Sequence, residues 1–250
     1  MATLHLDLSE QEVERIAGFL GYGNPCGSVW FIGIEEGLGG ATLDDAIKNL
    51  KARGKFEKEI MDLREAHHKR LRDKRGPIDW DVSPPWAPPW QWMAKIMRAY
   101  EGERDWNDKS SANKYVQACL GRSGGATFLT ELSPIPSKKA ADNEFRQALE
   151  GLHPALNKKI EDRRNSLIRL LEESRPAMVI CYGDGQVKTR EFAEFFGVEW
   201  ESVGNSIRRD PARPYPFILV PFFGLGKMKA AVIEEMLGLR LLPGQGTMSK

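Results

Sequence analysis

The apolar run at residues 29–34, Val-Trp-Phe-Ile-Gly-Ile, constrains the fold more than any other feature of the chain. It contains no charged side chain and is too short for a typical helix. Continuous apolar runs of this length are typical of β-strands buried on both faces, as in parallel sheets covered by helices. Three further segments have a similar character, at residues 126–132, 177–182 and 216–221.

Helical patterns separate these four segments. The first helix is predicted to follow Ser9, because Ser9 and Glu12 have the spacing of a capping box. Further helices are expected at residues 90–100, 114–120, 141–149, 158–174, 187–196 and 227–237, with a short strand at 199–203. Strands that alternate with helices predict a parallel sheet with helices on both faces. We therefore expect an α/β fold with a four-stranded parallel central sheet flanked by helices.

We expect a single domain over residues 1–242, followed by a disordered tail at 243–250. An insertion is expected at about 42–92. Its part 42–75 is helical by composition, and residues 48–75 hold eleven Lys or Arg against five Asp or Glu. Its part 76–90 carries five prolines and three tryptophans, so regular structure is not expected there. The sequence leaves open whether this Trp/Pro-rich segment is a lid, a duplex wedge or packing against the sheet.

Composition bounds the function classes. The net charge of +1 gives no overall basic field, although a local basic patch can still bind nucleic acid. The three cysteines are far apart, which excludes a disulfide framework and indicates a reducing compartment. No signal peptide is apparent, and no apolar run approaches the roughly 20 residues of a membrane span. We expect a cytoplasmic monomer without a membrane partner.

The acidic pair Glu35 and Glu36 directly follows the first buried strand. In doubly wound sheets, ligands bind beyond the carboxyl ends of the strands. Glycines surround the pair, and they permit tight turns and close approach of a ligand to the backbone. A carboxylate at such a turn can orient or deprotonate water. Because neighbouring residues of an extended chain point to opposite sides, we expect only one of the two glutamates to face the cleft.

The other strand ends add candidate ligand-binding groups. The stiff turn after the second strand carries serines and lysines suited to phosphate, namely Ser133, Ser137, Lys138 and Lys139. The turn after the fourth strand places aromatics before lysines at a helix N-terminus, namely Phe222, Phe223, Gly224, Lys227 and Lys229. Tryptophans of the 76–90 segment, among them Trp86, are candidates for stacking on a base. For each of these groups, packing or solvation is the alternative interpretation.

Several cofactor classes lack their motifs. The string at 37–42, Gly-Leu-Gly-Gly-Ala-Thr, lacks the third glycine of a dinucleotide-binding fingerprint. The chain has no phosphate-binding P-loop, no H-E-x-x-H zinc motif and no G-x-S-x-G nucleophile elbow. We therefore expect neither a cofactor nor a metal.

The four strand ends together resemble the uracil-DNA glycosylase superfamily. Its first motif, in forms such as G-Q-D-P-Y or G-E-A-P-G, is similar to Gly33-Ile34-Glu35-Glu36-Gly37, with Glu36 in place of the usual proline. The segment Phe128-Leu-Thr-Glu131 resembles the end of the family's second strand, with Glu131 in the place of the base-reading Asn. The last motif, often H-P-S-P, corresponds to 222–227 and has no histidine here. The similarity spans residues ~20–240 in order and spacing.

The resemblance implies a four-stranded parallel sheet sandwiched by helices and a function in base excision repair. The target base would flip out of DNA, and Glu35 would activate the water that attacks C1′. Gly33, Ile34, Glu131, Phe222, Phe223 and Trp86 would bind the base. The serines and lysines at the strand ends, with Gly224, would hold the DNA backbone. An acceptor at Glu131 in place of an amide implies a base preference broader than uracil.

Two other functions remain open at this stage. One is a nucleic-acid-binding protein on the same fold without catalytic activity. The other is an enzyme that acts on a small nucleotide, for which duplex binding would be weak and without a steep salt dependence.

Overall fold

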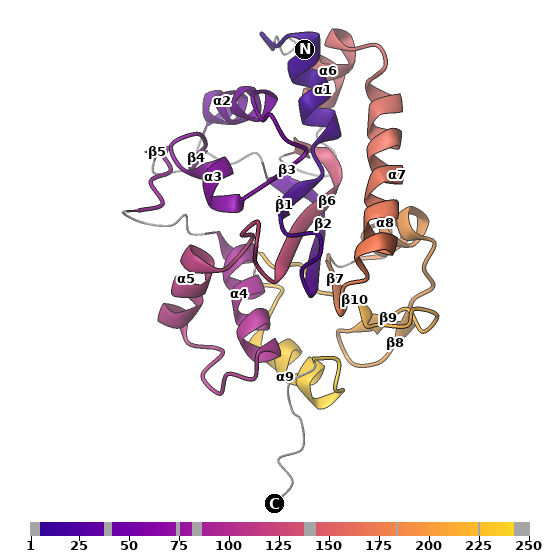
Figure 1. Cartoon of the computed structure of the whole chain (residues 1–250). Coiled ribbons are helices and arrows are strands. Elements are labelled where there is room, and N and C mark those ends of the chain that lie inside the picture. Colours follow the sequence, from indigo (N-terminus) through magenta and orange to yellow (C-terminus); the bar gives the residue numbers. More distant parts are fainter. Residues whose placement is uncertain are drawn as a thin grey trace, which may run out of the picture.

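The computed structural model describes residues 6–37, 42–73, 76–81, 87–137, 144–183, 185–224 and 226–242. A twisted sheet runs through the middle of the molecule, and helices cover it (Figure 1). The α/β architecture expected from the four apolar segments is confirmed.

The centre of the sheet is made of four parallel strands in the order β6-β2-β7-β10. These are the four segments expected from the sequence, with the bounds Thr127–Ser137 (β6), Val29–Gly37 (β2), Met178–Tyr182 (β7) and Phe217–Val220 (β10). The expectation of a sheet of only four strands is wrong, because the sheet has eight in the described part of the chain. The added strands have two or three residues each: β1 (Gly21–Gly23), β3 (Ile60–Met61), β8 (Glu201–Ser202) and β9 (Arg208–Arg209). The expected short strand at 199–203 corresponds to β8, while the other three are too short to carry a period-2 pattern from which a sequence could predict them.

The residues of each central strand alternate between two hydrophobic cores. One face of the sheet presents Phe31, Leu129 and Ile180 to helices α3, α4, α5 and α9. The bounds of these helices are Leu63–His67, Pro88–Tyr100, Lys109–Ala118 and Ala230–Gly238. Burial on both faces explains why the strands are continuously apolar.

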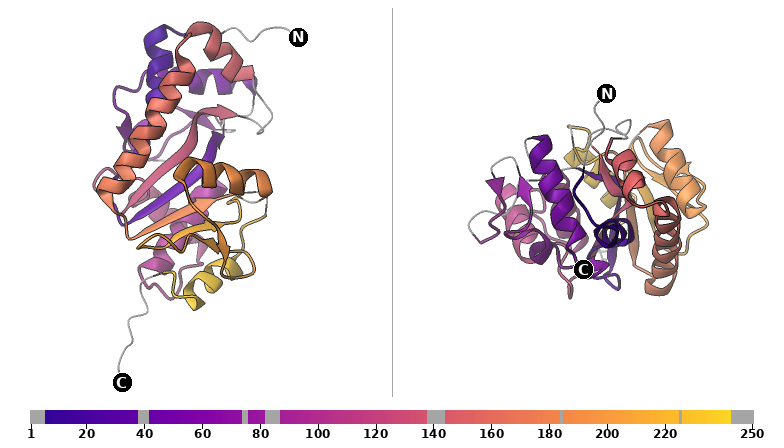
Figure 2. Two further views of the ribbon diagram at one scale, coloured as in Figure 1. Left: turned by 90° about the vertical axis from the view of Figure 1, so that its right-hand side faces the viewer. Right: turned by 90° about the horizontal axis from the view of Figure 1, so that it is seen from above.

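The opposite face of the sheet packs Ile32 and Cys181 against α7 (Leu156–Ser174) and α8 (Gln186–Phe196). These two helices lie together on one side of the molecule when it is seen from above (Figure 2, right). A third core joins α1 (Glu10–Gly18), α2 (Leu43–Gly54) and α6 (Glu144–Leu152) near the end of β6. The capping box at Ser9 and Glu12 is present and begins α1.

The strand ends differ from expectation. Residues 35–37 are not a turn, since β2 continues through them and Glu35 pairs in register with Ser133 of β6. Likewise Pro134 and Pro136 do not stop β6, which reaches Ser137. The pairing of β6 with β2 shifts register here, since Glu35 pairs with Ser133 but Gly37 pairs with Ser137, and prolines are tolerated at such a bulge.

The insertion is less helical than expected. Between α2 and α4 the chain forms β3, the short α3, and a two-stranded ribbon of β4 (Arg72–Asp73) and β5 (Gly76–Pro77). Trp80 at the end of this segment is fully buried in the core, which favours the packing interpretation for that residue. No helix of the described residues is long and apolar enough to cross a membrane.

His67 is buried in the core beside Tyr22, Trp80 and Trp90, and its Nδ1 lies 2.9 Å from the Leu63 carbonyl oxygen. Burial, assisted by the positive charge of Arg53, lowers the pKa of His67 from 6.5 to about 3. The imidazole therefore stays neutral in the folded protein at physiological pH.

We expect His67 to make the fold sensitive to acid. Below pH 6.5 the unfolded chain takes up a proton at His67 that the folded protein does not bind until about pH 3. This residue thus contributes stability at neutral pH that is lost as the pH falls, by up to about 1.4 kcal/mol per pH unit. Urea unfolding of the wild type and of His67→Asn at several pH values should show a shallower slope in the variant. Equal slopes would contradict the assignment.

Candidate active site

Three neighbouring strands meet at one level to form the centre of the site. Glu131 of β6 is the register partner of Gly33 of β2, and Tyr182 of β7 lies on the other side of Gly33. The Tyr182 hydroxyl donates a hydrogen bond of 2.5 Å to Glu131 Oε1. A Cβ atom added to Gly33 would collide with Glu131 Oε2 and lie 2.5 Å from the Tyr182 hydroxyl. The absent side chain of Gly33 is therefore what lets the carboxylate and the phenol meet across the strand.

Phe223 completes the support of this group. It follows β10, is fully buried, and stacks on Tyr182 with ring centroids 4.5 Å apart and planes 10° apart. Offset stacking of this kind fixes the plane of the tyrosine ring and hence the direction of its hydroxyl. Phe223 is thus a core residue that positions Tyr182, and its ring is closed to a ligand.

Arg163 of α7 holds the strand that carries Glu131. Its guanidinium is buried and donates to the carbonyl oxygens of Glu131 (2.8 Å), Leu132 (2.9 Å) and Phe19 (2.5 Å). These bonds satisfy backbone groups at the part of β6 where β1 no longer pairs with it. Burial lowers the pKa of Arg163 to about 10, and the nearby charge of Glu131 opposes this shift. At neutral pH the arginine remains a cation behind the site.

A pocket opens where β1 and β6 part, and Glu131 and Tyr182 lie in its wall. Its cavity volume is about 50 Å³, within about 470 Å³ of space between the walls that is partly open to solvent. Aromatic side chains dominate the lining, from Phe19, Tyr22, Trp90 and Tyr182, while Glu131, Ser133 and Arg163 supply polar groups. Aromatic walls with a few convergent polar groups are typical of sites that bind a small planar ligand.

The predicted water activator Glu35 is not itself among the residues that line this pocket. It is half-buried, and by strand alternation it shares the face of Gly33. Its register partner Ser133 lines the pocket, so the pocket edge passes beside Glu35. Ile34 points the other way and packs in the opposite core, which excludes it as a base-binding side chain. Glu36 belongs to β2, and its side chain lies outside the described residues.

The aromatic and basic residues after β10 form a separate rim. Phe222 is half-buried, and the Lys188 Nζ lies 5.0 Å from its ring centroid. Gly224 leaves room for the Phe222 ring, since an added Cβ would lie 2.6 Å from it. Lys227 and Lys229 are exposed, with Lys229 at the N-cap of α9. None of these residues lines the aromatic pocket.

Of the other residues expected to contact DNA or the base, the structure describes the side chain of Ser133 only. The Ser133 hydroxyl bonds the backbone of Ile135, which commits it to its own strand. Ser137 ends β6, and its side chain lies outside the described residues, as do Trp86, Lys138 and Lys139 entirely. The disordered tail predicted at 243–250 also falls outside them.

Sequence reasoning missed Tyr182, Arg163 and Lys188 as parts of the site or its rim, whereas Trp90, one of the tryptophans expected to stack on a base, does line the pocket. Tyr182 could have been found from the sequence, because its hydroxyl ends a strand whose other residues are apolar. Arg163 carries none, since one more basic residue in a charged helix looks solvated.

One histidine and two aspartates lie as close together as the ligands of a metal ion would. Ligand atoms of His68, Asp79 and Asp81 lie within 4.8 Å of one another. The His68 Nδ1 accepts a hydrogen bond of 3.0 Å from the backbone N–H of Trp80, and Asp81 pairs with Arg64. These partners already account for the geometry of the group, which lies apart from the residues that line the aromatic pocket.

Comparison with models of known protein families gives no match for this chain, and no curated protein sequence matches it. The function is therefore argued from the site.

We expect Gly33→Ala to disrupt the site and the core beneath it. The added methyl group must displace Glu131 and Tyr182, both fixed by further contacts, and overpacking of this kind costs about 1–3 kcal/mol. Gly18→Ala at the end of α1 is the matched control, because a Cβ there meets no atom within 4 Å. Thermal and urea unfolding of both variants measure the effect. A Gly33→Ala protein as stable as the control would contradict the described packing.

Proposed function

We propose that the protein is a DNA glycosylase that hydrolyses the N-glycosidic bond of uracil, or of another deaminated or damaged base, in DNA. The observation that carries the proposal is the Glu131 carboxylate, held by Tyr182 over Gly33 in the wall of an aromatic pocket. The pocket lies beside the carboxyl end of β7, whose last residue is Tyr182, while β2 and β6 continue beyond Gly33 and Glu131; α/β sheets bind their ligands beyond the carboxyl ends of their strands. The motif resemblance to uracil-DNA glycosylases supports the same assignment.

The pocket walls suit a flipped nucleobase. Phe19, Tyr22 and Trp90 offer ring faces or edges against which a planar heterocycle can pack. An ionised carboxylate only accepts hydrogen bonds, so Glu131 would select a base edge that presents an N–H or an amine. Uracil N3–H, hypoxanthine N1–H and the amine of a damaged cytosine all meet this requirement. The proposed preference is therefore broader than uracil.

Glu35 is the proposed activator of water. In the reaction the bond from C1′ to the base nitrogen breaks, and its electron pair leaves with the base. Water adds to C1′ and loses a proton to Glu35, while the departing base gains a proton from solvent, so that an abasic sugar and a free base result. The corresponding histidine of the family is lacking, which implies a slower departure of the base.

DNA is the proposed partner, and the rim after β10 is the proposed contact to its backbone. Lys227 and Lys229 are exposed near the start of α9, where backbone N–H groups also favour anions. Lys188, whose Nζ lies over the Phe222 ring, would add a third positive charge to this rim.

Excision assays test the catalytic assignment. Labelled duplexes with a single uracil, hypoxanthine or ethenocytosine are incubated with the protein, and abasic sites are detected by alkaline cleavage. We expect Glu35→Gln to lower the excision rate by roughly 100-fold or more, because a neutral amide cannot take the proton from water. Glu191→Gln on α8, a half-buried carboxylate removed from the pocket lining, is the control and should keep the wild-type rate. Full activity of Glu35→Gln would remove Glu35 from the mechanism.

The base-reading role makes a separate prediction. Glu131→Gln adds an amide donor to the pocket wall and should change the ratio of excision rates among the three substrates, rather than lower all rates equally. Tyr182→Phe keeps the stacked ring but loses the hydrogen bond to Glu131, and it should weaken discrimination in the same assay. Unchanged rate ratios in both variants would exclude Glu131 as the base reader.

The same experiments separate the other two functions. Tight, salt-dependent binding of duplexes without any abasic product would identify a binding protein without catalytic activity. Weak binding without a steep salt dependence would favour an enzyme of small nucleotides.

A further inference from the structure

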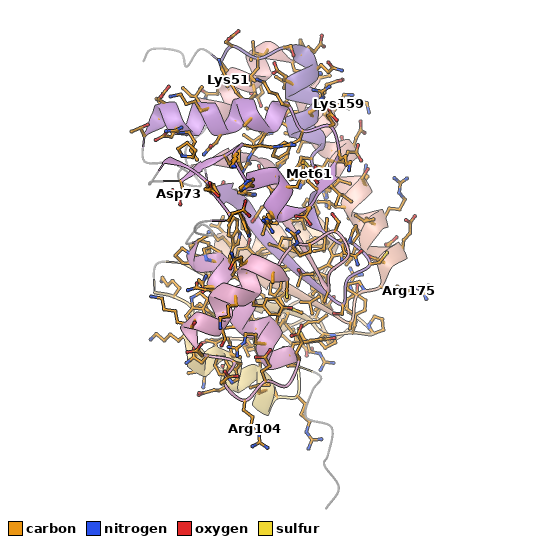
Figure 3. The ribbon with its side chains drawn as sticks, turned by 60° about the vertical axis from the view of Figure 1, so that its left-hand side comes forward. Lys51, Met61, Asp73, Arg104, Lys159 and Arg175 are labelled. Atoms are coloured by element: carbon orange, nitrogen blue, oxygen red, sulfur yellow. The ribbon has the colours of Figure 1, made fainter. Side chains whose placement is uncertain are left out.

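A groove lined almost entirely by cations lies on the outer side of α2. Its lining consists of Lys48, Lys51, Lys55 and Arg70 around Ala52. The three lysines are spaced three and four residues apart, so they form one row along the helix, about 10 Å long. Arg70 reaches the groove from the segment between α3 and β4. Lys51 lies at the end of the molecule opposite Arg104 (Figure 3).

The charges of this groove are available to a ligand. No acidic side chain is among the residues that line it. Lys55 and Arg70 are exposed, and neither forms an ion pair with any described residue. Lys48 pairs with Asp44, and Lys51 Nζ lies 3.2 Å from Asp7, but both aspartates are largely exposed. Exposed pairs of this kind contribute little and exchange readily for another anion.

We propose that this groove binds the phosphate backbone of nucleic acid. The inference rests on the proposed function for the identity of the ligand as DNA. The straight row of lysines suits regularly spaced phosphates. The groove offers only Ala52 as an apolar side chain, so it lacks the anchors that insert into a lipid surface.

Salt-dependent binding tests the groove with the full chain. Fluorescence anisotropy with a labelled single-uracil duplex is measured for the wild type and for Lys55→Ala/Arg70→Ala at several salt concentrations. Each lost phosphate contact should reduce the slope of log K against log salt by about 0.9, so the double variant should lose between one and two units of slope. Its affinity should fall roughly tenfold at about 0.1 M salt.

A matched control removes the same charge elsewhere. Lys158→Ala/Arg169→Ala takes two exposed cations from α7, whose apolar residues pack against the other face of the sheet. This variant should bind with the wild-type affinity and slope. Equal losses in both double variants would show that net charge alone matters and would overturn the proposal, as would wild-type behaviour of Lys55→Ala/Arg70→Ala.

Competition identifies the ligand class. Unlabelled duplex should displace the labelled DNA, whereas polyglutamate and vesicles containing phosphatidylserine at equal charge should not. Equal displacement by polyglutamate or vesicles would assign the groove to an acidic peptide or a membrane surface and would overturn the proposal. Excision is scored separately: groove-dependent binding without base release would refute the glycosylase and leave the groove as a nucleic-acid contact.

Discussion

The contact of Glu131 with Tyr182 across Gly33 is the constraint on which the rest of the site depends. A carboxylate inside a sheet needs partners, because burial of a charge without them is unfavourable. Here a phenol donates a hydrogen bond at 2.5 Å, and a glycine leaves the space in which the two groups meet. The strand order decides this arrangement, since β6 and β7 lie on opposite sides of β2.

Two further layers keep that contact in place. Phe223 stacks on Tyr182 from one direction, and Arg163 binds the backbone carbonyl of Glu131 from the other. Phe223 thus orients the Tyr182 ring, and Arg163 fixes the backbone that carries Glu131. The aromatic pocket opens where β1 stops pairing with β6, and Arg163 satisfies the carbonyl groups that this gap exposes. The interruption of the ladder thus creates both the pocket and the need for the buried arginine.

The distribution of charge follows from the same architecture. The net charge of +1 conceals a local separation, with Glu35 and Glu131 on central strands and basic residues gathered after β10 and along α2, which also carries Asp44 and Asp45 in its first turn. A ligand with a hydrogen-bond-donating head and an anionic chain fits this separation. A nucleotide within DNA has this chemistry.

The sequence by itself determined the four central strands, because continuous apolar runs report burial on both faces. It also indicated Glu131, since a charged residue near the end of an otherwise apolar strand is conspicuous. It did not reveal that Glu35 lies within a strand, because the pairing of residues 35–37 with β6 depends on a partner about a hundred residues away.

Tertiary structure alone decided the partners of each polar group. Tyr182 and Glu131 are 51 residues apart, and Arg163 reaches back 144 residues to Phe19. The hydrophobic pattern of a strand or helix indicates which of its own residues are buried. Which side chains meet depends on strand order and helix placement, and these are set by the packing of the whole chain.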